Sequence, residues 1–254
     1  MDLSDLTLGN IFLLETLGTM VLIILGGGVV ANHVLSKTKG NSGGWVLITF
    51  GWGFAVFAGV YVAFASGAHL NPAVTIGLAL SGAENFANGV PVDATSITVY
   101  LLAEMLGAFL GAVVVYLAYK QHFDATENKA LKLAVFSTGA EIRNPLWNVV
   151  TEAIATFILI FWILLSGYTD SAIGPLGVAL IVVAIGMSLG GPTGYAINPA
   201  RDLGPRIAHA LLPIKDKGPS DWGYSWIPVV GPLIGGAAAA LIARGFGLVG
   251  ILPV

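Results

Sequence analysis

Two identical tripeptides, Asn71-Pro72-Ala73 and Asn198-Pro199-Ala200, have the clearest chemical meaning in this chain. Asn is a good helix N-cap, and Pro is favourable in the first helical turn because its missing N–H has no intrahelical partner there. Each tripeptide therefore predicts the start of a helix, and a helix N-terminus has roughly half a positive charge. The Asn side chains can also offer amide N–H donors to a solute.

Irregular, Gly-rich backbone precedes each tripeptide, in segments 66–81 and 190–211, which we predict to be too short to cross a bilayer. Non-helical backbone at membrane depth is tolerated only where it is buried in protein or lines a watery cavity. We therefore expect a ladder of carbonyl acceptors along a pore. Its members are Gly67, Ala68, His69, Gly194, Tyr195 and Ala196. His69 has no neighbours that would complete a metal site, so we predict none.

Charged residues in apolar segments are costly, and Arg201 directly follows the second tripeptide, so we interpret it as functional. Glu15 and Glu152 are equally costly, but we favour a structural role for them. Each could accept backbone N–H bonds from its irregular segment and so hold carbonyls toward the pore. A proton relay is the alternative. We expect His33, His122 and His209 in loops or at the membrane interface.

The composition indicates that the bilayer is the solvent of the elements that position these residues. Of 254 residues, 56% are hydrophobic and only 10% are charged, whereas soluble domains have about a quarter charged residues. The first residues lack the basic region of a cleavable signal, so the first apolar stretch should remain as a span. Six stretches are long enough to span a membrane. They are 10–34, 44–65, 96–119, 146–167, 172–189 and 225–243.

Other features of the composition exclude several kinds of protein. Cysteine is absent, which removes disulfides, thiolate metal sites and cysteine nucleophiles. The net charge of −3 gives no basic surface for nucleic acid. Several charges in 121–143 predict a solvated loop, and 215–221 should be a polar turn before the last span.

The chain also repeats itself. The two tripeptides lie half a chain length apart, and Glu15-x-x-x-Thr19 in the first span matches Glu152-x-x-x-Thr156 in the fourth. Three spans and a half-helix, followed by the same again, predict two inverted repeats, 1–120 and 144–254, within one channel domain, 1–254. Such repeats place a pathway at their interface near the midplane. The two helix N-termini would meet there, and their field would oppose cations and protons more than neutral solutes.

The segments SGAHLNPAVT and GYAINPARD resemble the two signature motifs of the aquaporin superfamily, and the similarity extends from Glu15 to the last span. The resemblance implies an all-α membrane protein with six transmembrane helices and two half-helices. It also implies a homotetramer in the cell membrane with one pore per subunit and no cofactor. Asp202, Arg206 and Pro228 resemble the glycerol facilitator branch, and we expect Asp202 to orient its loop rather than bind solute.

By resemblance, the narrowest filter is formed by Trp52, Gly186, Tyr195 and Arg201. The two aromatic rings suit the carbon edge of a polyol, Arg201 suits its hydroxyls, and Gly186 leaves room for a solute wider than water. Tyr195 replaces the Phe usual in facilitators, which could narrow or polarise the filter. The spacing from Trp52 to Asn71 is one residue shorter than the family pattern, so Gly51 and Phe50 remain alternatives.

The distribution of basic residues conflicts with the family orientation, which places both termini in the cytoplasm. Eight loop cations would then lie outside, whereas the positive-inside rule predicts the reverse. They are Lys37, Lys39, Lys120, Lys129, Lys132, Arg143, Lys215 and Lys217. Arg244 is the main basic residue on the other side.

These observations predict a passive channel for glycerol and related small uncharged solutes, with some water, that excludes ions and protons. One alternative is a water-selective channel. Another is a broader neutral-solute channel for dihydroxyacetone, urea or protonated lactic acid. A secondary active transporter is an alternative of a different class, because inverted repeats occur there too. No nucleophile–base pair or metal-ligand cluster is found in the sequence, so we predict no enzyme.

Overall fold

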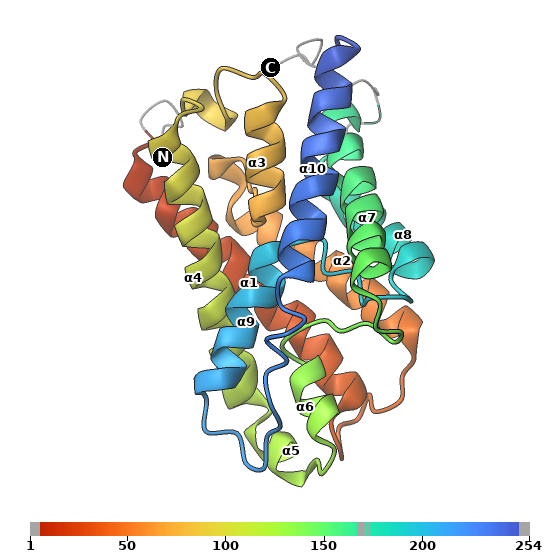
Figure 1. Ribbon diagram of the computed structural model, residues 1–254. Coiled ribbons are helices and arrows are strands. Elements are labelled where there is room, and N and C mark those ends of the chain that lie inside the picture. Colours follow the sequence, from red (N-terminus) through yellow and green to blue (C-terminus); the bar gives the residue numbers. More distant parts are fainter. Residues whose placement is uncertain (1–5, 167–170, 172, 249–254) are drawn as a thin grey trace.

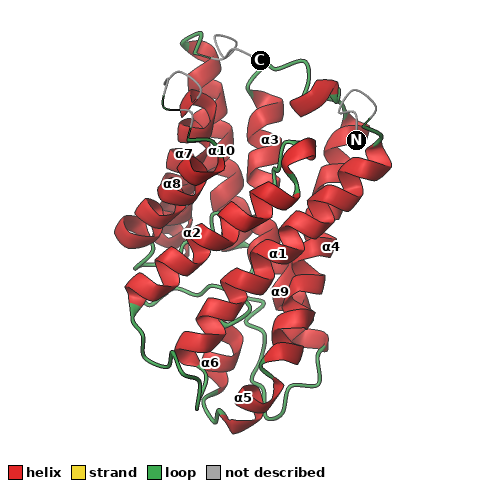
Figure 2. Cartoon of the chain, turned by 180° about the vertical axis from the view of Figure 1, so that it is seen from behind, coloured by secondary structure: helices red, strands yellow, loops and turns green. Residues whose placement is uncertain are grey.

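A computed structural model describes residues 6–166, 171 and 173–248, and these residues form helices and loops without a β-strand (Figures 1 and 2). The helices are α1 (Leu8–Val34), α2 (Trp45–Val62), α3 (Pro72–Leu80), α4 (Ala94–Ala118), α5 (Lys120–Ala125), α6 (Lys129–Ala134), α7 (Pro145–Leu165), α8 (Pro175–Leu189), α9 (Pro199–Leu211) and α10 (Ile227–Gly245). Short 3₁₀ turns lie at Phe64–Ser66 and Ala87–Gly89.

The predicted all-α membrane architecture is confirmed. Within the described residues, α1, α2, α4, α7 and α10 are long and apolar enough to cross a membrane, and α8 is a shorter apolar helix of 15 residues. The predicted span ends at Gly167 and Ala172 lie outside the described residues. The half-helices α3 and α9 begin at the two predicted prolines.

The spans pack through close backbone contacts that require glycine. A Cβ at Gly107 of α4 would lie 2.3 Å from the carbonyl oxygen of Thr16 in α1. A Cβ at Gly235 of α10 would lie 2.1 Å from the carbonyl oxygen of Ala153 in α7. Lipid supplies no hydrophobic driving force for helix association, so membrane helices associate through close van der Waals packing, which small residues at such crossings permit. The pairs α1–α4 and α7–α10 thus flank the two half-helices.

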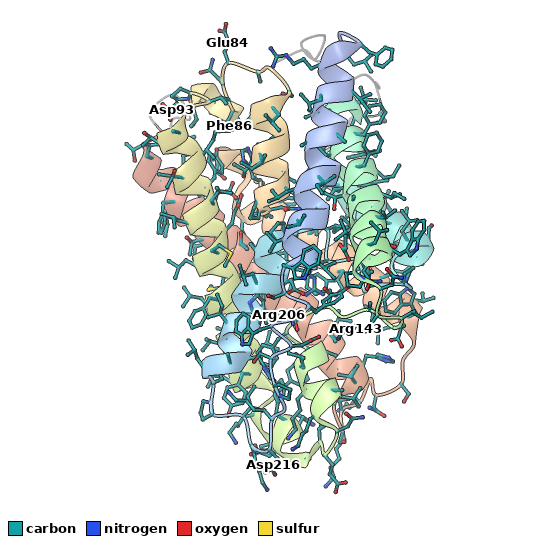
Figure 3. The ribbon with its side chains drawn as sticks, viewed as in Figure 1. Glu84, Phe86, Asp93, Arg143, Arg206 and Asp216 are labelled. Atoms are coloured by element: carbon teal, nitrogen blue, oxygen red, sulfur yellow. The ribbon has the colours of Figure 1, made fainter. Side chains whose placement is uncertain are left out.

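Several charged side chains lie near the two ends of the bundle (Figure 3). Glu84 and Asp93 lie near the end where α1 begins, whereas Asp216 lies at the opposite end. Arg206 is an exception, because its side chain is fully buried inside the bundle. A charge at that position needs internal partners, which the site geometry supplies.

The prediction of a solvated loop at 121–143 was wrong. This stretch contains most of α5 and all of α6, and it buries Phe123 and Phe136. Lys132 is also buried, and its ammonium group donates to the carbonyl of Lys215. The charges had suggested exposure, but the apolar side chains of this stretch, Phe123, Val135 and Phe136, pack into the hydrophobic core. A lysine can bury its stem while its ammonium finds an acceptor.

His209 was also wrongly predicted to be a loop or interfacial residue. It lies in α9 and is fully buried, with Nδ1 2.8 Å from the hydroxyl oxygen of Ser220. Its ring meets Phe136 edge to face at 5.4 Å. The segment 121–143 therefore covers the C-terminal part of α9 rather than extending into solvent.

Candidate solute pathway

Each half-helix is capped by the asparagine of its tripeptide. The Asn71 side-chain oxygen accepts a hydrogen bond from the Ala73 N–H at 2.9 Å. The Asn198 side-chain oxygen accepts from the N–H groups of Ala200 at 3.0 Å and Arg201 at 3.1 Å. These bonds satisfy donors that a helix start otherwise leaves unpaired.

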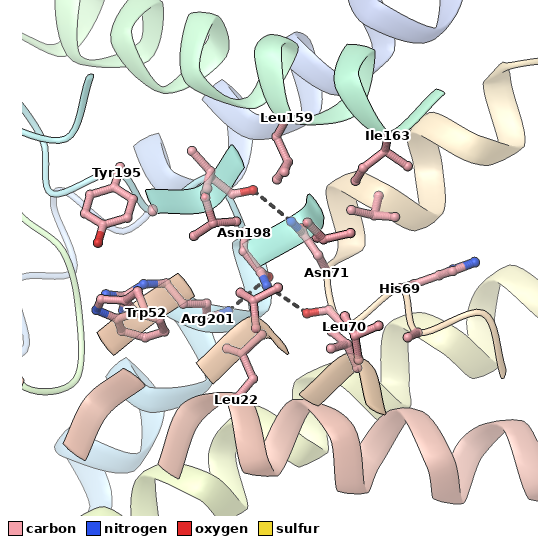
Figure 4. Close-up of a pocket in the computed structure, with 18 of the residues that line it drawn as sticks. Leu22, Trp52, His69, Leu70, Asn71, Leu159, Ile163, Tyr195, Asn198 and Arg201 are labelled. Carbon is pink, nitrogen blue, oxygen red and sulfur yellow. Dashed lines mark hydrogen bonds between the residues drawn. The ribbon is translucent and has the colours of Figure 1, made fainter. Parts of the chain in front are cut away.

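The two caps are joined to one another across the repeat (Figure 4). The Asn71 amide donates to the carbonyl of Ile197 at 2.9 Å, and the Asn198 amide donates to the carbonyl of Leu70 at 2.7 Å. The two N-termini therefore meet head to head. Sequence reasoning missed Leu70 and Ile197, although each directly precedes an asparagine that was identified.

Glu15 holds the first irregular segment. One carboxylate oxygen accepts from the Ser66 hydroxyl at 2.5 Å and from the His69 N–H at 3.0 Å. The other accepts from the Leu70 N–H at 2.8 Å. The backbone N–H groups of His69 and Leu70 thus have a carboxylate acceptor in Glu15.

Glu152 holds the second segment in the same way. Its carboxylate accepts from the Thr193 hydroxyl at 2.6 Å and from the N–H groups of Ala196 at 3.0 Å and Ile197 at 2.9 Å. The backbone that it holds is strained, because Tyr195 and Ile197 have φ of 38° and 45°. A non-glycine residue adopts such angles only when its surroundings impose them.

A cavity of about 160 Å³ runs beside these segments. Its apolar lining includes Leu22, Val56, Val74, Leu159, Ile163 and Val182. Its polar lining is formed by the irregular segments, both capping asparagines and Arg201. Five of the six residues predicted to line a pore lie on it, but Gly194 does not, because it packs against Thr138 instead. The cavity is therefore amphipathic.

The His69 side chain turns away from the ladder of carbonyls. Its ring stacks on Tyr100 at 4.0 Å, and Nδ1 lies 2.9 Å from the Thr75 hydroxyl oxygen. The Thr75 hydroxyl in turn donates to Glu104 at 2.7 Å. Among the described residues, no group of three or more metal-ligating side chains is present.

Trp52 and Arg201 lie together at one end of the cavity (Figure 4). The Arg201 guanidinium lies 3.9 Å from the centre of the Trp52 ring, which is a cation–π contact. Trp52 is 4% exposed and lines the cavity. Of the alternatives, neither Phe50, which is 39% exposed, nor Gly51, which packs against Val29, is among the residues that line the cavity.

Gly186 does not line the cavity, although we expected it to leave room for solute. A Cβ at Gly186 would lie 2.8 Å from Cζ of Tyr195 and 3.0 Å from its hydroxyl oxygen. The glycine therefore makes room for the Tyr195 ring, which is itself on the cavity wall.

Asp202 and Arg206 form a fully buried ion pair directly beyond the filter region. Asp202 accepts from the N–H of Thr138 at 2.7 Å and from its hydroxyl at 2.8 Å. Arg206 donates to the carbonyls of Ser220 at 2.8 Å and Thr138 at 3.0 Å. The charges are compensated locally, and Asp202 does not reach the cavity wall. This geometry ties α9 to the loops that surround it.

An all-helical bundle in which two half-helices meet at their N-termini beside an amphipathic cavity defines a membrane channel. The chain belongs to the family described as major intrinsic protein, whose model matches residues 3–243. The resemblance to the aquaporin superfamily is thereby confirmed. The protein crosses the cell membrane several times, and its family indicates transport rather than catalysis.

Curated relatives cover nearly the whole chain. The glycerol uptake facilitator protein of Streptococcus pneumoniae is 52% identical over 231 residues, which cover 90% of this chain and 95% of that protein. The glycerol uptake facilitator protein 3 of Lactiplantibacillus plantarum is 51% identical over 231 residues, which cover 90% and 93%. The solved aquaglyceroporin of Plasmodium falciparum has a TM-score of 0.76 at 34% identity and covers 94% of this chain and 96% of its own.

Proposed function

We propose that this chain is a passive channel for glycerol and related small uncharged solutes, with some water, and that it excludes ions and protons. The amphipathic cavity is the observation that supports this proposal most strongly. A linear polyol has one edge of carbons and one edge of hydroxyls. Its carbons match the apolar lining of Leu22, Leu159 and Val182, and its hydroxyls match the carbonyls of the irregular segments.

Specificity in this proposal comes from three side chains on the cavity wall, Trp52, Tyr195 and Arg201, with Gly186 behind the tyrosine. Arg201 donates to solute hydroxyls and repels cations. Asn71 and Asn198 each use one amide N–H in the cross-bond, and an amide has a second donor for a passing solute. Glu15, Glu152 and Asp202 hold the backbone that presents these groups.

We further propose a homotetramer with one pore per subunit. In each subunit a single channel domain, 1–254, would consist of inverted repeats 1–120 and 144–254. The paired roles of Glu15 and Glu152, and of the two capping asparagines, support this division.

Stopped-flow light scattering on proteoliposomes tests the proposed function. A hyperosmotic glycerol pulse should shrink the vesicles and then reswell them well above the rate of empty vesicles. Fast shrinkage without accelerated reswelling would instead establish a water-selective channel.

A broader neutral-solute channel is a second candidate, favoured by Tyr195. Its hydroxyl is buried and has no hydrogen-bond partner among the described residues. The same assay with urea or dihydroxyacetone in place of glycerol distinguishes the two. Uptake of these solutes at rates equal to that of glycerol would support the broader range.

A further inference from the structure

Trp45, at the start of α2, connects two distant parts of the chain without lining the cavity. Its indole N–H donates to the carbonyl of Gly186 in α8 at 2.9 Å, across 141 residues of sequence. The side chain is 40% exposed. An exposed tryptophan at a span end is usually a membrane-interface anchor, but this one has a directed bond to the backbone behind the filter.

The Tyr195 ring is held in place by packing alone. Its hydroxyl has no hydrogen-bond partner in the described part of the chain. The ring lies against α8 at Gly186 and Gly190, where a Cβ at Gly190 would be 2.5 Å from Cδ1 of Tyr195. The same Cβ would be 2.8 Å from Cζ2 of Trp45, so the indole and the phenol meet beside Gly190.

Trp45 completes this packing from the side. Its ring meets Tyr195 at 5.8 Å with an interplanar angle of 76°, which is the favoured edge-to-face geometry. No other aromatic contact of Tyr195 is found among the described residues. The position of the phenol therefore depends on the glycine surface and on the indole.

We propose that Trp45 is a positioning residue that sets the width of the filter by fixing the Tyr195 ring and the Gly186 carbonyl. It acts through Tyr195 and touches no solute. This inference rests on the proposed function, since it assigns a role in the same filter. It predicts that a residue outside the cavity controls which polyols pass.

The test compares permeability to erythritol, a four-carbon linear polyol, with permeability to glycerol in proteoliposomes. Trp45→Leu removes both the N–H donor and the aromatic edge, so the phenol can move into the vacated space. We expect the erythritol-to-glycerol ratio to rise about two- to tenfold, the range expected from one aromatic pair. Trp45→Phe keeps an aromatic ring but loses the donor, and should raise the ratio about twofold, less than leucine does.

Trp147→Leu is the matched control, because Trp147 is 63% exposed and lies outside the cavity wall. Its ratio should equal that of the unmodified protein. The erythritol-to-glycerol ratio does not change when a substitution merely reduces the amount of folded protein, because both permeabilities then fall by the same factor. If Trp45→Leu cannot be reconstituted, the phenylalanine variant alone decides the question.

A double variant tests whether Trp45 acts through the phenol. In a Tyr195→Ala background, Trp45→Leu should leave the ratio unchanged, since additivity fails for residues in contact. The inference would be overturned if both single Trp45 variants still passed glycerol and kept the erythritol-to-glycerol ratio of the unmodified protein. Absence of glycerol flux in the unmodified protein would instead overturn the proposed function.

Discussion

Replacing Glu152 should disable the pathway by releasing the second irregular segment. The carboxylate accepts three hydrogen bonds, two of them from the buried N–H groups of Ala196 and Ile197. Glu152→Leu leaves both donors unsatisfied, and each such donor costs about 1–3 kcal/mol. The expected loss is therefore about 2–6 kcal/mol, concentrated on the backbone that receives the Asn71 bond.

Two measurements report this loss of free energy. They are thermal unfolding in detergent and stopped-flow glycerol permeability per reconstituted channel. We expect Glu152→Leu to lower the unfolding temperature. We also expect it to reduce permeability at least tenfold, because a rise of about 1.4 kcal/mol in the free-energy barrier to permeation already corresponds to a factor of ten. Glu152→Gln retains one acceptor oxygen and should fall between leucine and the unmodified protein.

Glu141→Gln is the control, because this glutamate is exposed in a loop and is absent from the cavity wall. It should match the unmodified protein in both measurements. A folded Glu152→Leu channel with full glycerol permeability would refute the reasoning, since the segment would then hold its shape without the carboxylate.

Three further substitutions test the filter. Gly186→Phe should block glycerol more than water, because even a Cβ there would lie 2.8 Å from Cζ of Tyr195 and would push the phenol toward the cavity; equal losses in the two stopped-flow rates would count against this filter assignment. Arg201→Val should raise proton and cation leak, measured with a pH-sensitive dye inside vesicles, because it removes the charge beside Trp52; an unchanged leak would show that its charge is not the barrier. Tyr195→Phe removes a buried hydroxyl without a described partner, so the unfolding temperature should stay equal or rise while the urea-to-glycerol permeability ratio falls; a marked drop in that temperature would show that the hydroxyl has a stabilising partner.

The sequence could predict the architecture because its strongest signals are local. Asn followed by Pro specifies a helix start at Asn71 and Asn198, and the structure begins both half-helices there. The cost of a buried carboxylate likewise indicated that Glu15 and Glu152 need donors, and the neighbouring irregular segments supply them. The first argument depends on residues adjacent in sequence, whereas the second depends on repeat symmetry, because each glutamate lies more than 40 residues from the donors that it accepts.

Features that depend on distant packing could not be predicted. The stretch 121–143 has enough charges to suggest solvent, but Phe136 is buried by its contacts with His209 of α9 and with Phe123. Gly186 was assigned to the filter by resemblance to the family, and the sequence does not show that the Tyr195 ring packs against this glycine. The bond from Trp45 spans 141 residues, and no local pattern indicates it.

The central claim is that neutral polyols pass down their own gradient. The most direct measurement is the initial rate of glycerol entry into proteoliposomes over a wide range of glycerol concentrations, with and without imposed proton and sodium gradients. The proposed channel predicts a rate that rises in proportion to the glycerol gradient and is unaffected by either ion gradient. A rate that saturates and depends on an ion gradient would contradict it and would indicate a coupled transporter.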